Sequence, residues 1–496
     1  MSRRVDIMML SGCTLLATTI YLIAAYNSPL WTDELITIIT VRRPFLEGIF
    51  QREDYSAPLY QLLLRILVWG DRPSEWVVRA PAILCAVISL PVVWWLARSL
   101  FGNSVARLVV PLVTLNGLFA HYAREGRPYS MFFLLSALSM ASFWQLVHAG
   151  RKRDWLLYVG STAALCYSHY YGLLCLPAQA VYAAGEVRFH KPSRRKGLLA
   201  FAAVGVVAVL VLPAVWLVWR YITSGIPAMS ESWLRRPVFL HTILFWHVGE
   251  LMGSPGFGPL CVYTFLVAFW QPAALYDPKA IKSVPSTIPG NWWERHRPAL
   301  LCGLWIVFSL GVPVAISSVR PIYHVRYGLP VLMPVLLLQL AGLQRMRRLW
   351  TVVIIVLVLF INLPMIKGVL LGRLGFPQVI AWIQDNHDEG APVFVTDWGY
   401  CDNWINPEQF GLRYYGLPQE RIRLLPLKYP FGSGLRCPEQ MRTDQRVIVV
   451  GHIGGAEIAE YLRAESRDYQ VHAFDVLFLF DIEKPAGRTR SPLAGG

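Results

Sequence analysis

The stretch "IMMLSGCTLLATTIYLIAAY", residues 7–26, is a continuous apolar run that ends at the polar segment "NSPLWTDELITI", residues 27–38. About 20 apolar residues suffice for a helix to cross the roughly 30 Å hydrocarbon core of a bilayer. No small-residue cleavage site follows the run, so we expect a retained first membrane span. Asp33 and Glu34 stand just beyond that span, where a carboxylate is costly unless it is paired or solvated.

The composition is that of a helical membrane protein. Of the 496 residues, 55% are hydrophobic and only 16% are charged, and the mean hydropathy is +0.43. The alternating ten-residue segments of a membrane β-barrel do not occur in the sequence. We therefore expect an all-α polytopic membrane domain of about 11 spans, at residues 7–26, 76–97, 106–122, 129–148, 155–169, 171–185, 198–219, 241–270, 299–318, 327–344 and 349–366.

The distribution of basic residues predicts the orientation. The net charge of +15 does not indicate nucleic-acid binding, because the lysines and arginines gather in short loops between apolar runs. With the N-terminus inside, the inner loops include "GRKRD", "EVRFHKPSRRKG" and "QRMRR", which satisfies the positive-inside rule. This orientation puts Asp33, Glu34 and the C-terminus on the extracytoplasmic side of what we expect to be a bacterial inner membrane.

Two segments differ from the spans. The first outer loop, residues 27–75, contains "APLYQLLLRILVWG", whose apolar residues recur at helical spacing and predict an amphipathic surface helix. Residues 367–496 are more polar and alternate helical and strand patterns. We expect a small extracytoplasmic α/β domain there, after a membrane domain of residues 1–366. A disulfide between Cys401 and Cys437 stays open.

The adjacent carboxylates are the first candidates for chemistry. A carboxylate at the membrane surface can act as a general base that takes a proton from an attacking hydroxyl or amine. The alternative is structural, because acidic residues in a first turn favour a helix that starts near Thr32. Adjacency alone leaves both interpretations of Asp33 and Glu34 open.

Basic residues gather in two short outer loops, "HYAREGRPYS" (121–130) and "SSVRPIYHVRYGLP" (317–330). Arginines on the side where positive charge is disfavoured indicate a bound anion, and a guanidinium suits a phosphate. The alternative is snorkelling toward lipid head groups. The candidates of these loops are Arg124, Arg127, Tyr129, Arg320, His324, Arg326 and Tyr327.

The remaining candidates are histidines. His169, followed by Tyr170 in "CYSHYYG", is either an active-site residue or an ordinary interfacial histidine. His247 and Glu250 are three residues apart, but no third ligand follows at a diagnostic spacing. We predict no cofactor; a divalent metal is compatible with the sequence but is not required.

The ordered set "WTDE", "PLYQLLLR", "AREGRPY", "SHYYG" and "RYGLP" resembles the GT-C membrane glycosyltransferases. Within them it is similar to the group of dolichyl-phosphate-mannose protein mannosyltransferases and aminoarabinose transferases, over roughly residues 1–345. The resemblance implies an inverting transfer of a sugar from a polyprenyl-phosphate donor on the extracytoplasmic side. It implies membrane lipids as surroundings and a glycan, lipid or protein as acceptor, and it leaves the sugar and the acceptor open.

The resemblance also implies roles for residues. Asp33 matches the position of the catalytic base and Glu34 that of its partner. The "ARxxRPY" segment, with Arg124, Arg127 and Tyr129, matches donor or acceptor binding. Arg326 and Tyr327 are implied to contact the lipid phosphate, and His169 with Tyr170 to line the active site. One departure is "SAPLY" (56–60), where relatives often have His-Pro-Pro before the Leu-Tyr, which leaves any acceptor contact of that histidine without a counterpart.

A multi-pass transporter or flippase of a lipid-linked saccharide is the main alternative. Transporters tend to place charged groups near the bilayer midplane on broken helices. In this sequence the interiors of the expected spans carry few ionisable residues, and the charges stand at one mouth. The pattern therefore favours an enzyme.

Overall fold

The computed structural model describes residues 3–44, 57–68, 73–190, 193–223, 292–319, 322–344, 348–388, 391–397, 406–426, 447–451, 469–474 and 477–482. Its contacts divide the chain into two compact units. Unit 1 comprises Met1–Ala25, Tyr55–Val68 and Trp76–Leu371, and unit 2 comprises Tyr26–Asp54, Trp69–Glu75 and Gly372–Gly496. The predicted span at 241–270, Arg320, both cysteines of the open disulfide and the His247–Glu250 pair lie outside the described residues.

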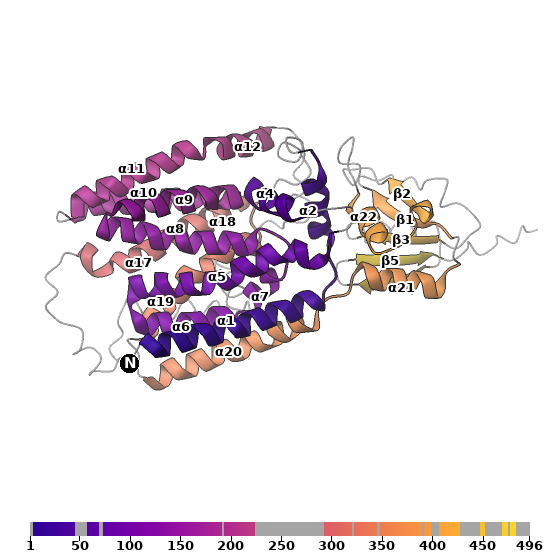
Figure 1. The fold of residues 1–496 in the computed structure, drawn as a ribbon, viewed down its shortest axis with the longest axis horizontal. Coiled ribbons are helices and arrows are strands. Elements are labelled where there is room, and N and C mark those ends of the chain that lie inside the picture. The colour runs from indigo at the N-terminus through magenta and orange to yellow at the C-terminus, as the bar shows by residue number, and fades with distance from the viewer. Residues whose placement is uncertain are drawn as a thin grey trace, which may run out of the picture. The chain divides into compact units, whose positions relative to one another are not determined.

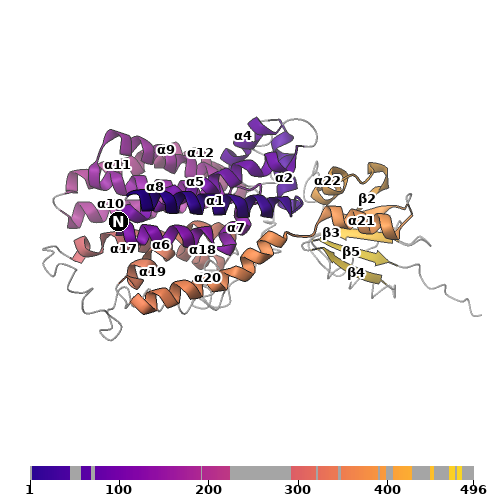
Figure 2. The same cartoon turned by 60° about the horizontal axis from the view of Figure 1, so that its bottom comes forward.

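Unit 1 is a bundle of helices that run side by side (Figures 1 and 2). Every predicted span except 241–270 coincides with described helical structure. The helices are α1 (Arg3–Tyr26), α4 (Pro58–Leu67), α5 (Glu75–Phe101), α6 (Asn103–Thr114), α7 (Gly117–Ala123), α8 (Tyr129–Ala149), α9 (Lys152–Ser168), η1 (Tyr170–Leu174), α10 (Cys175–Phe189), α11 (Arg194–Leu210), α12 (Leu212–Thr223), α17 (Trp292–Ile306), η5 (Val307–Gly311), α18 (Val312–Ser317), η6 (Val325–Val331), α19 (Leu332–Leu343) and α20 (Arg348–Leu371).

The described helices confirm a polytopic membrane protein, while the span count stays a prediction. Six of them are long and apolar enough to cross a membrane, or up to eight if each bent pair is one span. The expected span 106–122 is such a pair, since α6 and α7 meet at 61°. Asn116 starts α7 there, and its side chain accepts a hydrogen bond from the Phe119 N–H at 2.8 Å. The described α20 continues to Leu371, past the boundary predicted at residue 366.

Polar side chains join α8, α9 and α10 inside the bundle. The Tyr158 hydroxyl donates to the Gln179 side-chain carbonyl at 2.9 Å, and the Gln179 amide donates to Ser139 at 2.9 Å. Ser139 and Thr162 share a hydrogen bond of 2.7 Å. Hydrogen bonds of this kind between helices, with small residues that allow close approach, hold membrane bundles together.

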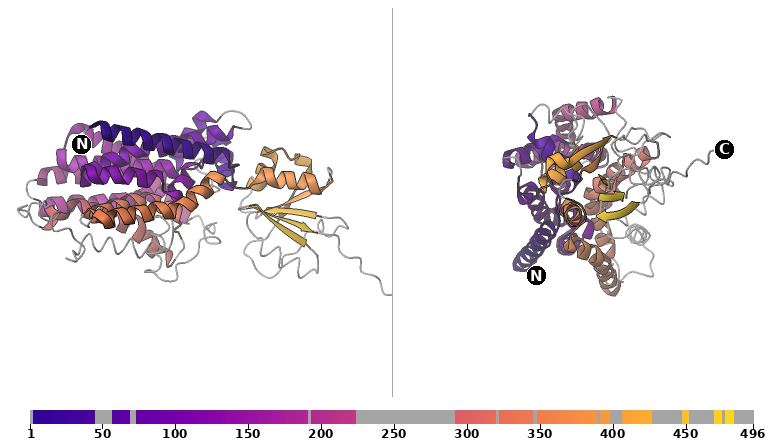
Figure 3. Two further views of the ribbon diagram at one scale, coloured as in Figure 1. Left: turned by 90° about the horizontal axis from the view of Figure 1, so that it is seen from below. Right: turned by 90° about the vertical axis from the view of Figure 1, so that its right-hand side faces the viewer.

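Unit 2 contains the predicted α/β fold. Its five-stranded sheet has the order β2-β1-β3-β5-β4, formed by β1 (Val393–Asp397), β2 (Ile422–Pro426), β3 (Val447–Gly451), β4 (Tyr469–Phe474) and β5 (Leu477–Ile482). β1 is parallel to β2 and β3, while β5 is antiparallel to β3 and β4. Figure 3 shows the strands beside α21 (Phe376–Asn386). The structure adds β2 and α22 (Pro407–Tyr414), which the sequence patterns did not predict.

Unit 2 also includes part of the first outer loop. The helix α2 (Thr32–Arg42) carries Asp33 and Glu34 in its first turn, as the structural interpretation of that pair predicts, and it packs against α22. In unit 1 the predicted surface helix is confirmed as α4, with Pro58 at its start. The acidic pair therefore belongs to a folded unit that combines parts of the first outer loop with the C-terminal part of the chain.

Candidate functional site

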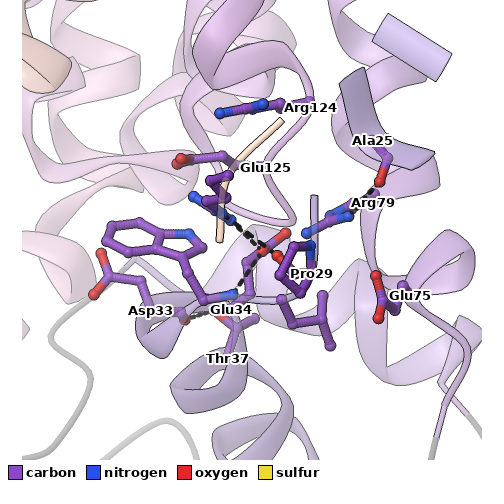
Figure 4. Close-up of polar contacts among 12 residues, drawn as sticks. Ala25, Pro29, Asp33, Glu34, Thr37, Glu75, Arg79, Arg124 and Glu125 are labelled. Carbon is purple, nitrogen blue, oxygen red and sulfur yellow. Dashed lines mark hydrogen bonds and ion pairs between the residues drawn. The ribbon is translucent and has the colours of Figure 1, made fainter. Parts of the chain in front are cut away.

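The first turn of α2 separates the two adjacent carboxylates. Helical geometry turns successive side chains by about 100°, and in Figure 4 the Asp33 carboxylate points away from that of Glu34. Glu34 is fully buried, whereas Asp33 is only half-buried. The Glu34 carboxylate accepts a hydrogen bond from the Trp31 N–H at 3.2 Å, which satisfies one of the helix's first amide groups.

The Glu34 carboxylate has a cationic partner within unit 2. The Arg373 guanidinium donates to it at 2.8 Å, and the Arg373 side chain is also nearly buried, with 7% exposed. The same guanidinium lies 5.2 Å from the centre of the Trp31 ring. A buried carboxylate retains its charge when such a partner is present, so this pair holds the helix start together. No sequence pattern indicates Arg373 as this partner, because it is 339 residues from Glu34.

In unit 1 the segment "AREGRPY" is almost entirely buried. The Arg124 side chain donates to the Val369 carbonyl of α20 at 2.9 Å and lies 3.4 Å from His121 Nδ1. Glu125, between the two arginines, is 1% exposed and lies 3.3 Å from His121 Nε2. Arg124 thus links α7 to α20, a structural contribution that its sequence position does not reveal.

A second group of predicted residues does come together in unit 1. The Arg326 guanidinium lies 5.6 Å from the centre of the Tyr129 ring and 5.3 Å from that of Tyr327. His169 lies 5.2 Å from Tyr327 and stacks on Phe132 at 4.6 Å. The residues come from the consecutive helices α8 and α9 and from η6, which is distant in sequence, and they form one aromatic and cationic cluster.

The two histidines of this region start their 3-10 turns in the same way. His169 precedes η1, and its Nδ1 accepts from the Tyr171 N–H at 3.3 Å. His324 precedes η6, and its Nδ1 accepts from the Arg326 N–H at 3.3 Å. An accepting Nδ1 carries no proton, so each neutral ring bears its proton on Nε2 and presents a donor there.

The two turns also meet each other. The rings of Tyr171 and Tyr327 lie 5.2 Å apart, and the Tyr171 hydroxyl donates to the Ile322 carbonyl. Tyr171 is therefore a cluster residue that the sequence analysis did not single out. The neighbouring Tyr170 lies in η1.

Burial and nearby positive charges both lower the pKa of His169. His169 follows the last residue of α9 and precedes η1, and part of its surface is exposed. Burial, followed by the charges of Arg326 and Arg127, lowers the pKa of His169 to about 3. The imidazole is therefore neutral over the physiological range, where it serves as a hydrogen-bond donor and not as a cation.

A metal site is not evident among the residues that the structure describes, because no three or more His, Cys, Asp or Glu side chains are grouped so as to hold an ion. The expected absence of a cofactor remains a prediction. What the described side chains do offer is a half-buried carboxylate on α2 and, in unit 1, a cluster of guanidinium, imidazole and phenol groups.

Comparisons with known proteins bear on this arrangement. The family model of dolichyl-phosphate-mannose-protein mannosyltransferases matches residues 56–219. The structure of ArnT from Cupriavidus metallidurans bound to undecaprenyl phosphate aligns with a TM-score of 0.55 and 14% identity, over 97% of this chain and 98% of that one. The chain therefore has the fold of the GT-C membrane glycosyltransferases. A search of curated protein sequences gave no significant match.

A second solved structure supports the same fold. The oligosaccharyltransferase AglB from Archaeoglobus fulgidus, in complex with an inhibitory peptide and a dolichol-phosphate, aligns with a TM-score of 0.53 and 11% identity. It covers 98% of this chain and 75% of that one. The predicted GT-C resemblance is thereby confirmed, and the transporter alternative is not favoured. The roles of individual residues remain predictions.

Proposed function

We propose that the protein is an inverting glycosyltransferase that takes its sugar from a polyprenyl-phosphate donor on the outer face of a bacterial inner membrane. The carrying observation is the cluster around Arg326, where a guanidinium and two neutral imidazoles present N–H donors within one group of side chains. Such donors suit the phosphate of a lipid carrier. The match to ArnT bound to undecaprenyl phosphate supports the same donor class.

Asp33 supplies the other half of the proposed chemistry. It follows the end of α1 by seven positions, and it is half-buried while its neighbour Glu34 is engaged by Arg373. The Asp33 carboxylate takes the proton of the acceptor hydroxyl or amine, whose lone pair attacks the anomeric carbon. The bond from that carbon to the phosphate oxygen breaks, and its electron pair leaves with the polyprenyl phosphate.

The cluster in unit 1 acts on the leaving group. Negative charge grows on the phosphate oxygen as the bond breaks, and preorganised donors stabilise that charge without reorganising. Arg326, with Arg127 nearby, supplies the positive charge, while His169 and His324 supply neutral N–H donors. Arg124 holds the "AREGRPY" segment in place through its hydrogen bond to the Val369 carbonyl of α20. Attack from the face opposite the leaving phosphate inverts the anomeric centre.

The test is turnover by the purified protein with a panel of polyprenyl-phosphate sugars and candidate glycan, lipid and protein acceptors. We expect one donor to release polyprenyl phosphate. Asp33→Asn should lower that rate by about 10²- to 10⁴-fold, with donor binding retained. Asp385→Asn removes an exposed carboxylate of α21 and is the matched control. A normal rate for Asp33→Asn would exclude Asp33 as the base, and no release from any donor would exclude the proposed reaction.

A further inference from the structure

The segment that precedes α2 is held by residues of the C-terminal part of the chain. Within unit 2, the Tyr415 hydroxyl accepts a hydrogen bond from the Leu30 N–H at 2.6 Å and donates to the Glu75 carboxylate at 2.7 Å. The neighbouring Tyr414 hydroxyl donates to the Pro73 carbonyl at 2.6 Å. Both tyrosines stand at the end of α22, which packs along α2. One short segment therefore ties together both ends of the first outer loop.

Arg373 makes the most central of these contacts. Its guanidinium pairs with Glu34 at 2.8 Å, donates to the Pro29 carbonyl at 3.4 Å and lies over the Trp31 ring. One side chain thus contacts Pro29 and Trp31, which precede α2, and Glu34 in the first turn of α2. Removing the cation would leave the fully buried Glu34 carboxylate without the charge that stabilises it.

The backbone before Arg373 is specialised for this approach. Gly372 adopts φ +81°, a conformation that favours glycine. A Cβ atom at that position would clash with the Asn27 carbonyl oxygen, so only glycine lets the two backbones come this close. The sequence between α20 and α21 is therefore shaped to bring Arg373 against residues 27–34.

We propose that Arg373 is a positioning residue that fixes the first turn of α2 through Glu34, and so sets the direction of the Asp33 carboxylate. Unit 2 then contributes to the transfer reaction because its Arg373 orders α2, the helix that carries the proposed base. Glu34 acts as the buried partner of Arg373 and does not itself exchange protons with the substrate. This inference rests on the proposed function only where it concerns catalysis; the mechanical claim about α2 does not.

The experiment measures two properties of the full-length protein in detergent. Hydrogen exchange of the α2 amides reports the order of the helix, and steady-state transfer reports kcat and the donor KM. The variants are Arg373→Gln, Arg373→Lys, Glu34→Gln and the double variant Glu34→Gln/Arg373→Gln. Arg421→Gln is the control, because Arg421 donates to the carbonyls of Ala391 and Asp388 elsewhere in unit 2.

For Arg373→Gln we expect exchange in α2 to rise by about tenfold or more and kcat to fall by roughly 10- to 100-fold, because misplacing a reacting group by about 1 Å costs on the order of 10²-fold. The donor KM should stay within about twofold, since no donor contact is removed. Arg373→Lys should recover part of the loss. The double variant should be less impaired than Arg373→Gln, because it leaves no unpaired buried charge.

Unchanged exchange in Arg373→Gln would overturn the inference, and so would increased exchange with an unchanged kcat, which would make the pair a stabilising contact alone. An additive double variant would show that the two side chains do not act through each other. If the wild-type protein transfers no sugar, the proposed function fails, while the exchange measurements still decide whether Arg373 orders α2.

Discussion

Two arginines of unit 1 lie in contrasting surroundings. Arg297 of α17 donates from Nε and Nη2 to the two carboxylate oxygens of the buried Glu186 at 2.7 and 2.8 Å, and Trp293 donates to the same carboxylate at 3.2 Å. Arg326 of η6 lies over the rings of Tyr129 and Tyr327. A carboxylate neutralises a guanidinium, whereas the negative face of a tyrosine ring attracts and orients it. The same residue type thus joins two helices in one place and, in the other, lies among tyrosine rings in the proposed phosphate site.

The largest expected effect is on stability at the Arg297 pair. Arg297→Ala leaves Glu186 buried with its bidentate partner removed, which should lower the free energy of unfolding by about 3–5 kcal/mol. Donor KM measured well below the lowered melting temperature should be unchanged. Thermal unfolding in detergent and steady-state kinetics check the two halves of this prediction. A variant of normal stability, or one with a raised donor KM, would contradict the contrast between the two arginines.

The reverse pattern is expected at Arg326. Arg326→Ala should lower kcat/KM by about 10²- to 10³-fold, the usual effect of removing one group that stabilises developing negative charge. Arg326→Lys should recover only part, because an ammonium lacks the planar fork. Lys367→Ala, an exposed cation on α20, is the control for a simple loss of positive charge. Kinetics of Arg326→Ala that match those of Lys367→Ala would remove Arg326 from the site.

Two substitutions at His169 separate its role as the cap of η1 from its role as a hydrogen-bond donor. Asn in place of His169 keeps an acceptor for the Tyr171 N–H but lacks the distal donor, whereas Gln extends a donor toward the Nε2 position and loses the cap. We expect His169→Asn to lower kcat/KM by about tenfold, and His169→Gln to retain more activity while losing about 1 kcal/mol of stability. The opposite ranking in activity would mean that His169 acts only as a cap.

The smallest effect concerns pH. Since the pKa of His169 lies near 3 in the folded protein and its ordinary value is 6.5, the ring is neutral in the fold above that lowered pKa. As the pH falls from about 6.5 toward the lowered pKa, the unfolded chain binds a proton at His169 that the folded protein does not, so the free energy of unfolding decreases. Between about pH 5 and 8 the pH–rate profiles of wild type and His169→Gln should have the same shape. A limb near pH 6.5 present only in wild type would contradict this.

Sequence patterns predicted most of the elements because each is a local property. The apolar runs predicted the described membrane helices, helical spacing predicted α4, and strand-like segments within residues 367–496 predicted β1, β3, β4 and β5. The misses have local causes too. The expected span 106–122 is broken at Asn116, whose side chain caps a new helix, and β2 and α22 lie in a polar stretch where neither periodicity is strong.

The candidate site was predictable only in part. "RYGLP" and "SHYYG" identified Arg326, Tyr327 and His169, which the fold does bring together. The ion-pair partners that determine the role of a charged side chain were not predictable. Nothing local to "TDEL" or "GRLGFP" indicates that Glu34 and Arg373 form a buried pair, because pairing across hundreds of residues depends on the folded backbone.

The sequence by itself determined that this protein crosses a membrane, that its charged residues gather in loops between apolar runs, and that a polar α/β segment follows. These features are local, because hydropathy and spacing depend on neighbouring residues. Resemblance alone assigned the base to Asp33, and only the tertiary structure showed that Asp33 and Glu34 have different surroundings. The two carboxylates are adjacent and chemically alike, yet helix rotation directs one into contact with Arg373 and leaves the other half-buried. Burial and partners set the role of a charge, and both arise only when distant segments meet.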